Sequence, residues 1–346
     1  MNAGRRRVGA FASLASLLAV AVLLAVAVGA VWISPWDSLR LMAWKVHLTG
    51  HPAGIDHATE VILFQLRLPR VLLAALVGAG LAVAGAVFQA LFRNPLADPA
   101  IIGVSSGAAL GAIVVIISGA GAALGGLSIP GAAFVGALGT AVLVYRLARV
   151  GPAIQVATLL LAGIAVAAVI SSVISLVMTF SGQEVRSIYF WLLGGLEAAT
   201  WRQLAIGAPV MLVGMSAAMF STGDLNLSAL GEERAAQLGL EVARFKRTML
   251  ATGSLLAAVA VSVSGLIGFV GLMTPHILRL VVGSDHRRLV PASALGGATF
   301  MVLADLVART AVRPEEIPVG AVTAVLGGPF FLYLLRRERR AAGARA

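Results

Sequence analysis

The stretch "VLLAALVGAGLAVAGAVFQAL", residues 71–91, contains no charged side chain. A helix of this length crosses the roughly 30 Å hydrocarbon core of a bilayer. The run is typical of the whole chain, in which 59% of the 346 residues are apolar and 12% charged, with a mean hydropathy of +0.96. A soluble domain carries about 25% charged residues, and strands of a β-barrel alternate over about ten residues. The sequence therefore predicts an all-α integral membrane protein.

Apolar runs between helix breakers predict ten transmembrane helices in a single domain, residues 1–346. An even number of spans places both termini on one side of the membrane. With that side as the cytoplasm, the inner segments carry 17 Lys and Arg residues and the outer segments 8, as the positive-inside rule requires. The net charge of +11 is then a topology signal, and no nucleic-acid partner is needed to explain it. The expected spans are 10–33, 71–91, 99–119, 129–147, 155–180, 203–221, 246–264, 268–283, 290–309 and 318–335.

The sequence offers no catalytic constellation, and we expect no cofactor and no resident metal. There are no cysteines, H-E-x-x-H does not occur, and no paired carboxylates stand at a catalytic spacing. A nucleotide-binding Walker A loop needs Gly-Lys, but Lys45 follows Trp44 and Lys246 follows Phe245. Any ATP-binding site must therefore lie on another chain. His47, His51 and His57 occur in the first outer loop, where Gly50 and Pro52 favour a solvated loop over a metal site on one helix face.

One short, densely charged insert, "SALGEERAAQLGLEVARFKR" (residues 228–247), lies between the sixth and seventh spans on the expected cytoplasmic side. Its alanines and leucines favour helix, and Gly231 and Gly239 interrupt it. Two short helices, roughly 228–238 and 240–247, are expected to stand outside the bilayer as a docking platform. The residues alone leave open the alternative of an ordinary charged connector.

Three further features stand out near span ends. The segment "FRNPLADPA" (92–100) joins the second and third spans with turn-forming residues. The eighth span is interrupted by Pro275 and carries Arg279, so we expect it to face protein or a water-filled path. Asp305 and Arg309 are spaced i, i+4 and are expected to pair locally, whereas Asp305 and Arg279 differ too much in depth to pair.

Several stretches together resemble the FecCD-type membrane subunits of ABC importers for iron chelates, heme and vitamin B12. The resemblance runs from about residue 60 to the C-terminus, in the family's order. Its main motifs are "RLPRVLLAALVGAGLAVAGAVFQALFRNPLADPAIIGVSSGAALGA" (67–112), "ALGEERAAQLG" (229–239), "GLIGFVGLMTPHILRLVVGSDHRRLVP" (265–291) and "EEIPVGAVTAVLGGPFFLYLLRR" (315–337).

The resemblance implies a type II ABC importer permease with ten spans in the bacterial inner membrane. Its partners would be a second copy of itself, two ATP-binding cassette subunits and a periplasmic substrate-binding protein. The alternative from another class is an ion-coupled secondary transporter, which usually needs ionisable residues in mid-membrane. Only Asp305 and Arg279 lie well inside the expected spans, so this alternative is weaker.

The resemblance also implies roles for individual residues. Coupling to the ATPase would use Leu230, Gly231, Glu232, Glu233, Arg234, Gln237, Leu238 and Gly239. The translocation path and its gate would include Asn94, Pro95, Leu96, Gln155, Val156, Ala157 and Arg186. The binding protein would dock on arginines at the outer face, namely Arg67, Arg70, Arg309 and Arg313. The sequence as a whole looks most similar to the heme branch of the family, which favours heme as the substrate. Arg186 would then meet a heme propionate. Ferric siderophore and cobalamin stay open as alternatives.

Overall fold

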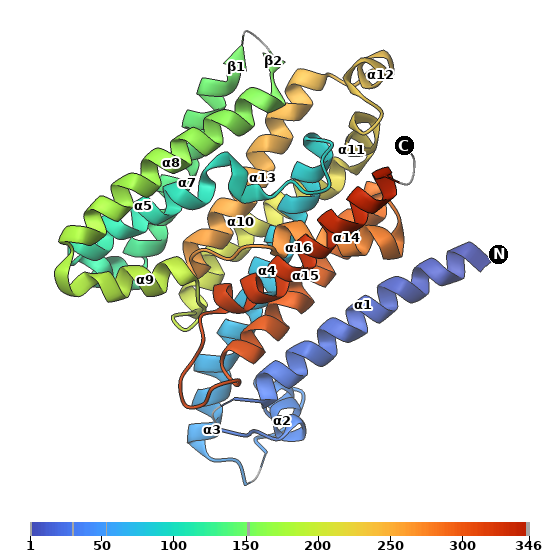
Figure 1. Ribbon diagram of the computed structural model, residues 1–346. Helices are drawn as coiled ribbons and strands as arrows, with labels where there is room; N and C mark the ends of the chain where they lie inside the picture. Colours follow the sequence, from blue (N-terminus) through green and yellow to red (C-terminus); the bar gives the residue numbers. More distant parts are fainter. Residues whose placement is uncertain (1, 30, 53, 151–152, 344–346) are drawn as a thin grey trace.

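The computed structural model describes residues 2–29, 31–52, 54–150 and 153–343. Within these ranges the regular elements are helices apart from two two-residue strands, and Figure 1 shows the helices as one elongated bundle. The principal elements are α1 (Asn2–Ala27), α2 (Pro35–Lys45), α3 (His57–Val61), α4 (Leu68–Leu91), α5 (Val104–Ile117), α6 (Ala123–Gly126), α7 (Ser128–Ala148), β1 (Arg149–Val150), β2 (Ala153–Ile154), α8 (Val156–Phe180), α9 (Val185–Leu193), α10 (Trp201–Phe220), α11 (Thr222–Ser228), α12 (Glu232–Gln237), α13 (Val242–Ser264), α14 (Val270–Val282), α15 (His286–Ala308) and α16 (Val319–Gly343). A π-helical turn (Ile62–Arg67) and the 3₁₀ turns Pro99–Ile102, Ala120–Ala122 and Gly182–Glu184 complete them.

Among the described residues, seven helices are long and apolar enough to cross a membrane. Three shorter apolar helices, Val104–Ile117, Val270–Val282 and Val319–Leu334, fall where the third, eighth and tenth spans are expected. A helical bundle of this kind confirms the all-α membrane class. The count of ten complete crossings stays a prediction, because the three short helices alone do not reach the length of a bilayer-spanning helix.

The 71–91 stretch forms most of α4, which lies at the centre of the bundle. Helix α4 packs against α10, α13, α14 and α15, and most of its side chains are buried. Two of its glycines allow this approach: a Cβ on Gly78 would lie 2.2 Å from the Gly297 carbonyl oxygen, and one on Gly85 1.7 Å from that of Gly271. Neighbouring backbones are therefore in direct contact, as small residues permit in membrane bundles.

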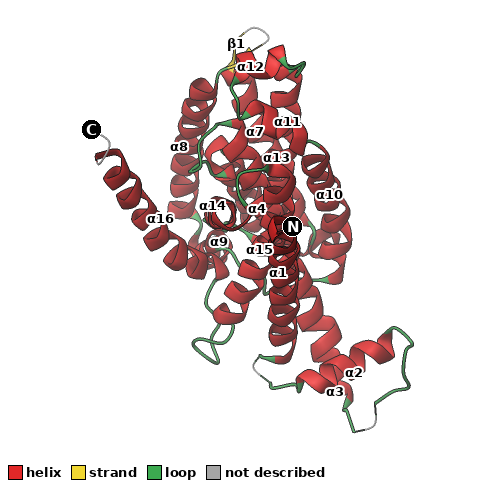
Figure 2. Cartoon of the chain, turned by 90° about the vertical axis from the view of Figure 1, so that its right-hand side faces the viewer, coloured by secondary structure: helices red, strands yellow, loops and turns green. Residues whose placement is uncertain are grey.

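The remaining helices form two groups around this centre. Figure 1 shows α5, α7, α8 and α9 gathered on one side of α4 and α13, with α1, α15 and α16 on the other. Helices α5 and α7 pack closely together, and α1 packs on α15. Helices α2 and α3 lie at one end of the molecule, while α11, α12 and the β1–β2 hairpin lie at the opposite end (Figures 1 and 2). This separation agrees with the expected outer and cytoplasmic sides.

Two span boundaries differ from the sequence-based expectation. The second span was expected to begin at residue 71, but a continuous helix already begins at His57 and runs to Leu91. The separate short helix expected over 240–247 is wrong, because these residues lead into α13, which begins at Val242. A hydropathy pattern marks only the apolar part of a helix. When the first turns carry charged residues, the helix begins earlier than its apolar run, because the backbone hydrogen bonds do not depend on side-chain polarity.

Candidate transport path, coupling surface and outer charge cluster

The charged insert forms a turn, the short helix α12, a second turn and the start of α13 at the cytoplasmic end. Gly231 and Gly239 hold φ angles of +106° and +90°, which side chains other than glycine rarely adopt. Ala235 is fully buried, so α12 rests firmly on the bundle. Leu230 and Leu238, by contrast, are 52% and 60% exposed. The segment around α12 therefore packs on the bundle through Ala235 and exposes Leu230 and Leu238 to the surroundings.

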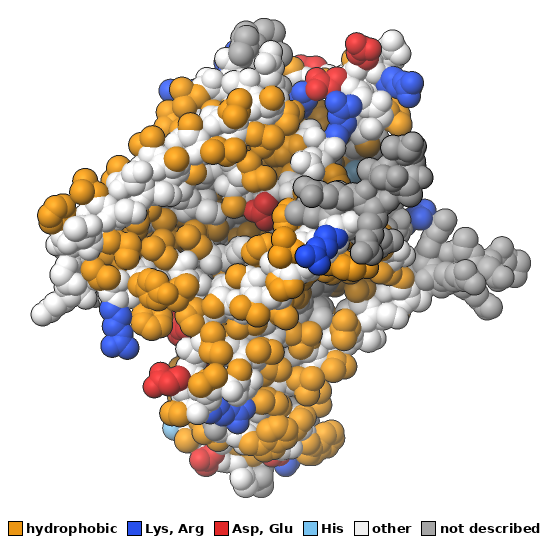
Figure 3. Space-filling model, in the orientation of Figure 1, with side chains coloured by type: hydrophobic (Ala, Val, Ile, Leu, Met, Phe, Trp, Pro, Cys, Tyr) orange, Lys and Arg blue, Asp and Glu red, His pale blue; other side chains and the backbone are white. Residues whose placement is uncertain are grey.

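The coupling residues proposed from the resemblance thus lie together on one surface. Glu233 and Arg234 are exposed, and Glu232 forms an ion pair with Lys246 (Oε1 to Nζ, 2.6 Å). Figure 3 shows acidic and basic side chains gathered at this end of the molecule. A shallow cavity of about 330 Å³ is lined by Arg93, Leu230, Gly231, Glu232, Glu233 and Arg234.

Arg93 connects this surface to the expected gate. It precedes Asn94, whose side-chain oxygen accepts a hydrogen bond from the Leu96 backbone N–H (2.9 Å). The Asn94 backbone closes a second bond from Ala97 N–H to its carbonyl oxygen (3.1 Å). This local bonding explains why asparagine suits the turn. The turn that includes Pro95 therefore lies directly beside the coupling surface.

The second expected gate segment lies at the start of α8. Gln155 precedes the helix, and its Oε1 accepts a hydrogen bond from the Thr158 hydroxyl (3.3 Å). Gln155 and Ala157 are exposed, and Val156 is half-buried. The preceding strands pair Arg149 with Ile154, so the helix begins immediately after a tight hairpin. Sequence reasoning missed this hairpin, because two-residue strands leave no periodic pattern.

Helix α8 exposes a wide face over most of its length. Its hydroxyl groups at Ser172, Ser175 and Thr179 each donate to the backbone carbonyl four residues earlier (2.9 Å in each case). Because each hydroxyl donates its proton to its own helix, it offers a ligand only an acceptor oxygen. Exposed Ile164 and Leu176 lie on the same helix. The face therefore offers a mildly polar wall without fixed charge.

A polar network in the cytoplasmic half was not foreseen from the sequence. Asn226 on α11 donates from Nδ2 to Asp285 Oδ1 (2.8 Å) and accepts at Oδ1 from the His286 backbone N–H (2.9 Å). Hydrogen bonding from Asn226 lowers the pKa of Asp285. The same Asn226 oxygen faces His286 Nδ1 (2.9 Å), so that nitrogen carries the proton. The segment preceding the coupling surface is thereby fastened to the start of α15.

Deeper in the bundle, a second polar bridge joins α14 to α4. The Arg279 guanidinium donates to Gln89 Oε1 (3.1 Å), and Gln89 Nε2 donates to the Leu272 carbonyl (3.1 Å). Arg279 does not pair with Asp305, as expected from their depths. Gln89 is the one polar side chain in the 71–91 stretch. A single amide side chain in an otherwise apolar span predicts a polar partner inside the bundle, so the sequence could have indicated this contact.

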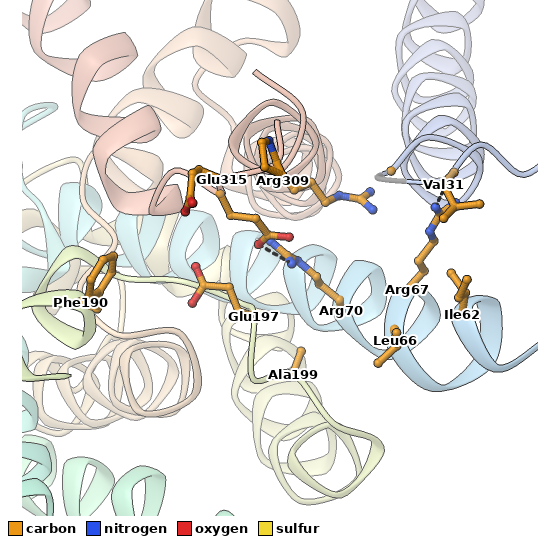
Figure 4. Close-up of a pocket in the computed structure, with 13 residues that line it drawn as sticks. Val31, Ile62, Leu66, Arg67, Arg70, Phe190, Glu197, Ala199, Arg309 and Glu315 are labelled. Carbon is orange, nitrogen blue, oxygen red and sulfur yellow. Dashed lines mark hydrogen bonds and ion pairs between the residues drawn. The ribbon is translucent and has the colours of Figure 1, made fainter. Parts of the chain in front are cut away.

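At the outer end, Arg67, Arg70 and Arg309 meet in a cavity of about 690 Å³ (Figure 4). Arg70 forms ion pairs with Asp305 (2.9 Å) and with Glu316 (2.9 Å), which lie on α15 and on the loop before α16. The expected pair of Asp305 with Arg309 is confirmed at 3.4 Å, without hydrogen-bond geometry. Arg70 is therefore the stronger partner of Asp305, a contact the sequence did not reveal.

Arg67 and Arg309, which are expected to dock the binding protein, are both buried in this structure, and their docking role stays a prediction. Arg67 is 5% exposed and donates to the carbonyl oxygens of Val26 and Ala27 (2.8 Å each). Arg309 is 7% exposed and donates to the Ala25 carbonyl. Both guanidinium groups cap the carbonyl end of α1, where cations are favourable. The helix begins at His57, so Arg67 lies inside it and faces α1. Arg313 remains exposed.

Two more side chains at the outer end bear on function. Arg186 on α9 is exposed, and its guanidinium lies 5.7 Å from the ring centre of Phe190, which lines the outer cavity. Glu197 also lines this cavity. Burial, together with nearby Glu316 and Asp305, raises the pKa of Glu197 against the opposing effect of Arg70.

The outer loop histidines do not assemble a metal site in the described chain. His51 Nε2 lies 2.5 Å from Glu60 Oε1, and His57 lies 3.8 Å from the same carboxylate. Within the described residues no group of three or more His, Cys, Asp and Glu is arranged to hold a metal ion. His276 lies edge-on to Phe330 with ring centres 6.3 Å apart, an ordinary packing contact.

Comparison with known proteins places this architecture in a family. The FecCD transport family model matches residues 17–337. The chain is 47% identical to the cobalamin import system permease protein BtuC of Halobacterium salinarum (89% of this chain, 81% of the relative). It is 43% identical to the hemin transport system permease protein HmuU of Yersinia pestis (80% and 84%).

A solved structure agrees with these relatives. It is described as an inward-facing conformation of a metal-chelate type ABC transporter, and it matches with a TM-score of 0.82 and 33% identity over 94% of this chain and 98% of that chain. The fold, the order of the motifs and the placement of the charged insert agree with this likeness. The chain belongs to the FecCD transport family, the multi-pass membrane permeases of type II ABC importers.

Proposed function

We propose that this permease carries a large metal tetrapyrrole, cobalamin or heme, into the cytoplasm along a path enclosed by two copies of the chain. The wide exposed face of α8 is the observation that carries the proposal. Hydroxyls already bonded to their own helix bind a polar cargo weakly, and mild affinity suits a wall past which a bulky chelate must slide. A second copy would place another α8 opposite this one.

Substrate choice rests on the relatives and on two outer side chains. A relative at 47% identity is named for cobalamin and one at 43% for hemin, so neither name decides the cargo. Arg186 and Phe190 offer a cation and an aromatic face near the outer cavity, which suits a flat macrocycle with acidic substituents. This pair keeps heme as a candidate beside cobalamin.

Partner chains would bind and hydrolyse the ATP that drives transport. The coupling surface at α12 would receive two ATP-binding cassette subunits, one for each copy of the permease. A periplasmic binding protein would deliver the chelate at the outer end. Ion coupling, the earlier alternative, has no support from the family to which the chain belongs.

Transport assays can test the proposal directly. The permease, reconstituted in liposomes with its ATPase and binding protein, should take up one tetrapyrrole with ATP and leave the other behind. Cobalamin and heme are assayed in parallel, with a ferric hydroxamate siderophore as the third cargo. If heme is the cargo, Arg186→Gln should lower its uptake; if cobalamin is the cargo, Arg186→Gln should leave its uptake unchanged. ATP-dependent uptake of the siderophore alone would contradict the tetrapyrrole proposal.

A further inference from the structure

Two adjoining cavities lie on the outer half of the bundle, away from the coupling surface. One, of about 270 Å³, lies between the ends of α5, α9 and α13 and the start of α7. The other, of about 250 Å³, extends deeper between α7, α10 and α13 and reaches Phe134, Val210 and Val259. Both are lined by Pro130, Gln203, Ser262 and Val263. They therefore adjoin one another along shared side chains.

The two cavities differ in polarity. The deeper one is lined by apolar side chains and glycines, with Gln203 and Ser262 at its outer end. The outer one contains Ser187, Ser264 and Glu197, which is the one charged side chain among its described lining residues. An apolar cavity that lies deeper than a polar cavity fits a lipid whose acyl chain points into the membrane and whose headgroup points outward.

Gln203 supplies a hydrogen-bond donor where the two cavities adjoin. Its Oε1 accepts the Thr200 backbone N–H (3.3 Å), while the Gln203 backbone N–H donates to the Thr200 hydroxyl (3.2 Å), so the two form a capping box. The amide oxygen of Gln203 is therefore already hydrogen-bonded, and the amide nitrogen Nε2 is the donor of the group. The side chain as a whole is only 8% exposed, and Gln203 lines both cavities. Its amide N–H groups can therefore donate to a ligand that occupies this space.

We propose that these cavities form a binding site for a phospholipid with an ammonium headgroup, such as phosphatidylethanolamine. One acyl chain occupies the apolar cavity, an ester or phosphate oxygen accepts from Gln203 Nε2, and the ammonium group pairs with Glu197. The volume of the apolar cavity is close to the lower end for ligand pockets, which suits part of one chain.

The surroundings identify lipid as the occupant. Helices α7 and α10 are apolar enough to span the membrane, and both expose large apolar side chains beside the cavity, including Val135 and Ile206. A crevice between such helices opens onto lipid. Glu197 is exposed and makes no ion pair within 4 Å with a described residue, while Arg70 acts on it from farther away, so its carboxylate can still meet an ammonium group. A zwitterionic lipid therefore fits better than an anionic one.

Substitutions at two glycines of α7 provide a matched pair for the test. Gly131 lines the apolar cavity, and a Cβ there meets no atom within 4 Å, so Gly131→Leu fills the space without a backbone clash. Gly139 lies on the same helix, equally exposed and equally free of neighbours, but outside both cavities. Gly139→Leu is therefore the control. Gln203→Glu keeps the capping oxygen and removes the amide donor.

The measurement is native mass spectrometry of the purified full-length permease, titrated with phosphatidylethanolamine or phosphatidylglycerol. We expect Gly131→Leu and Gln203→Glu to weaken phosphatidylethanolamine binding by about tenfold or more, as loss of a charged or buried hydrogen bond does. Gly139→Leu should bind like the wild type. Glu197→Gln should remove the preference for phosphatidylethanolamine over phosphatidylglycerol.

Three outcomes would overturn the site. Undiminished binding by Gly131→Leu would show that the lipid lies elsewhere. Equal affinity of the wild type for both lipids would remove the ammonium assignment. A second protein chain covering this face in the intact transporter, seen as cross-linking between copies from a cysteine placed at 206, would make it an interface between subunits.

Discussion

At the scale of single residues, buried charge is concentrated at the outer end of the bundle. Asp305 is 1% exposed and depends on Arg70 for its closest ion pair, with Arg309 as a second, poorly aligned cation. Breaking a buried pair by removing one partner is costly because the other charge stays desolvated. The same physics keeps Arg67 from serving as a mobile surface charge.

Replacement of Arg70 by glutamine should therefore destabilise the permease by about 3–5 kcal/mol. Chemical denaturation in detergent micelles measures this effect. Arg313→Gln, at an exposed position, is the control and should stay within about 0.5 kcal/mol of the wild type. Adding Asp305→Asn to Arg70→Gln should recover part of the loss, because the buried carboxylate is then gone while Arg309 loses its own partner. A double variant as unstable as the single one would show that charge burial is not the cause.

At the scale of elements, the short segment between α10 and α13 combines a rigid base with outward apolar side chains. Helix α12 is only six residues long, so it depends on its contacts with the bundle more than on its own hydrogen bonds. Ala235 is the one fully buried side chain of α12. Changes at this position should thus act on the whole element.

Ala235→Pro should remove the hydrogen bond from the Ala235 N–H to the Gly231 carbonyl (2.9 Å) and cost about 3 kcal/mol locally. We expect ATP hydrolysis by the assembled transporter to continue while substrate uptake falls. The experiment measures both rates in the same proteoliposomes. Ala229→Ser, outside α12, is the control. Wild-type uptake by a stably inserted Ala235→Pro variant would contradict a coupling role for α12.

Asn226→Asp should weaken the fastening of α11 to α15, because two carboxylates would then face each other across 2.8 Å. The expected result is a lower ratio of substrate imported to ATP hydrolysed. Combining it with Asp285→Asn exchanges the two groups, restores a donor and an acceptor, and should rescue that ratio. Failure of the exchanged pair to rescue coupling, with both proteins equally stable, would limit Asn226 to a packing role.

At the scale of the whole molecule, the proposed gate turn and the proposed coupling surface adjoin one another at the end that carries α12, and the start of α4, which carries Arg70, lies towards the opposite end (Figure 1). Arg93 lines the coupling cavity and precedes the gate turn directly. Motion of the proposed coupling surface would therefore have a short route to the proposed gate turn. This arrangement makes the two ends testable separately.

Leu96→Ala should widen the cytoplasmic exit of the path and raise passive leak of the transported chelate from loaded liposomes. Truncation removes apolar volume at a half-buried position on the gate turn. Leu147→Ala, on the exposed cytoplasmic end of α7, is the control for general loosening. Leak that rises equally in both variants would count against a gate at this turn.

Docking of the binding protein should depend on Arg313 more than on Arg67, since only the former has an exposed guanidinium. Arg313→Glu is expected to weaken association with the binding protein, and the wild-type complex should loosen as salt rises. Basal ATP hydrolysis should survive. Surface plasmon resonance at two salt concentrations tests this expectation. Unchanged affinity and salt dependence in Arg313→Glu would exclude Arg313 from the docking surface.

The sequence by itself determined the membrane class, the central apolar helix, the charged cytoplasmic insert and the family. These properties follow from local composition: a run of apolar residues such as 71–91 must avoid water, and the charges of 228–247 must avoid lipid, whatever the rest of the chain does. The i, i+4 pair of Asp305 and Arg309 was equally local, because one helix fixes the spacing.

Only the tertiary structure decided where each face of these helices points. Lipid and protein interior are both apolar, so an apolar pattern cannot tell which side of a helix meets a neighbour. Arg67 therefore looked like a surface charge until α1 was placed beside it. Likewise, Arg70 and Asp305 are 235 positions apart in the sequence and meet because direct glycine contacts bring α4 and α15 together. Contacts between distant residues depend on packing, and packing is a property of the assembled bundle.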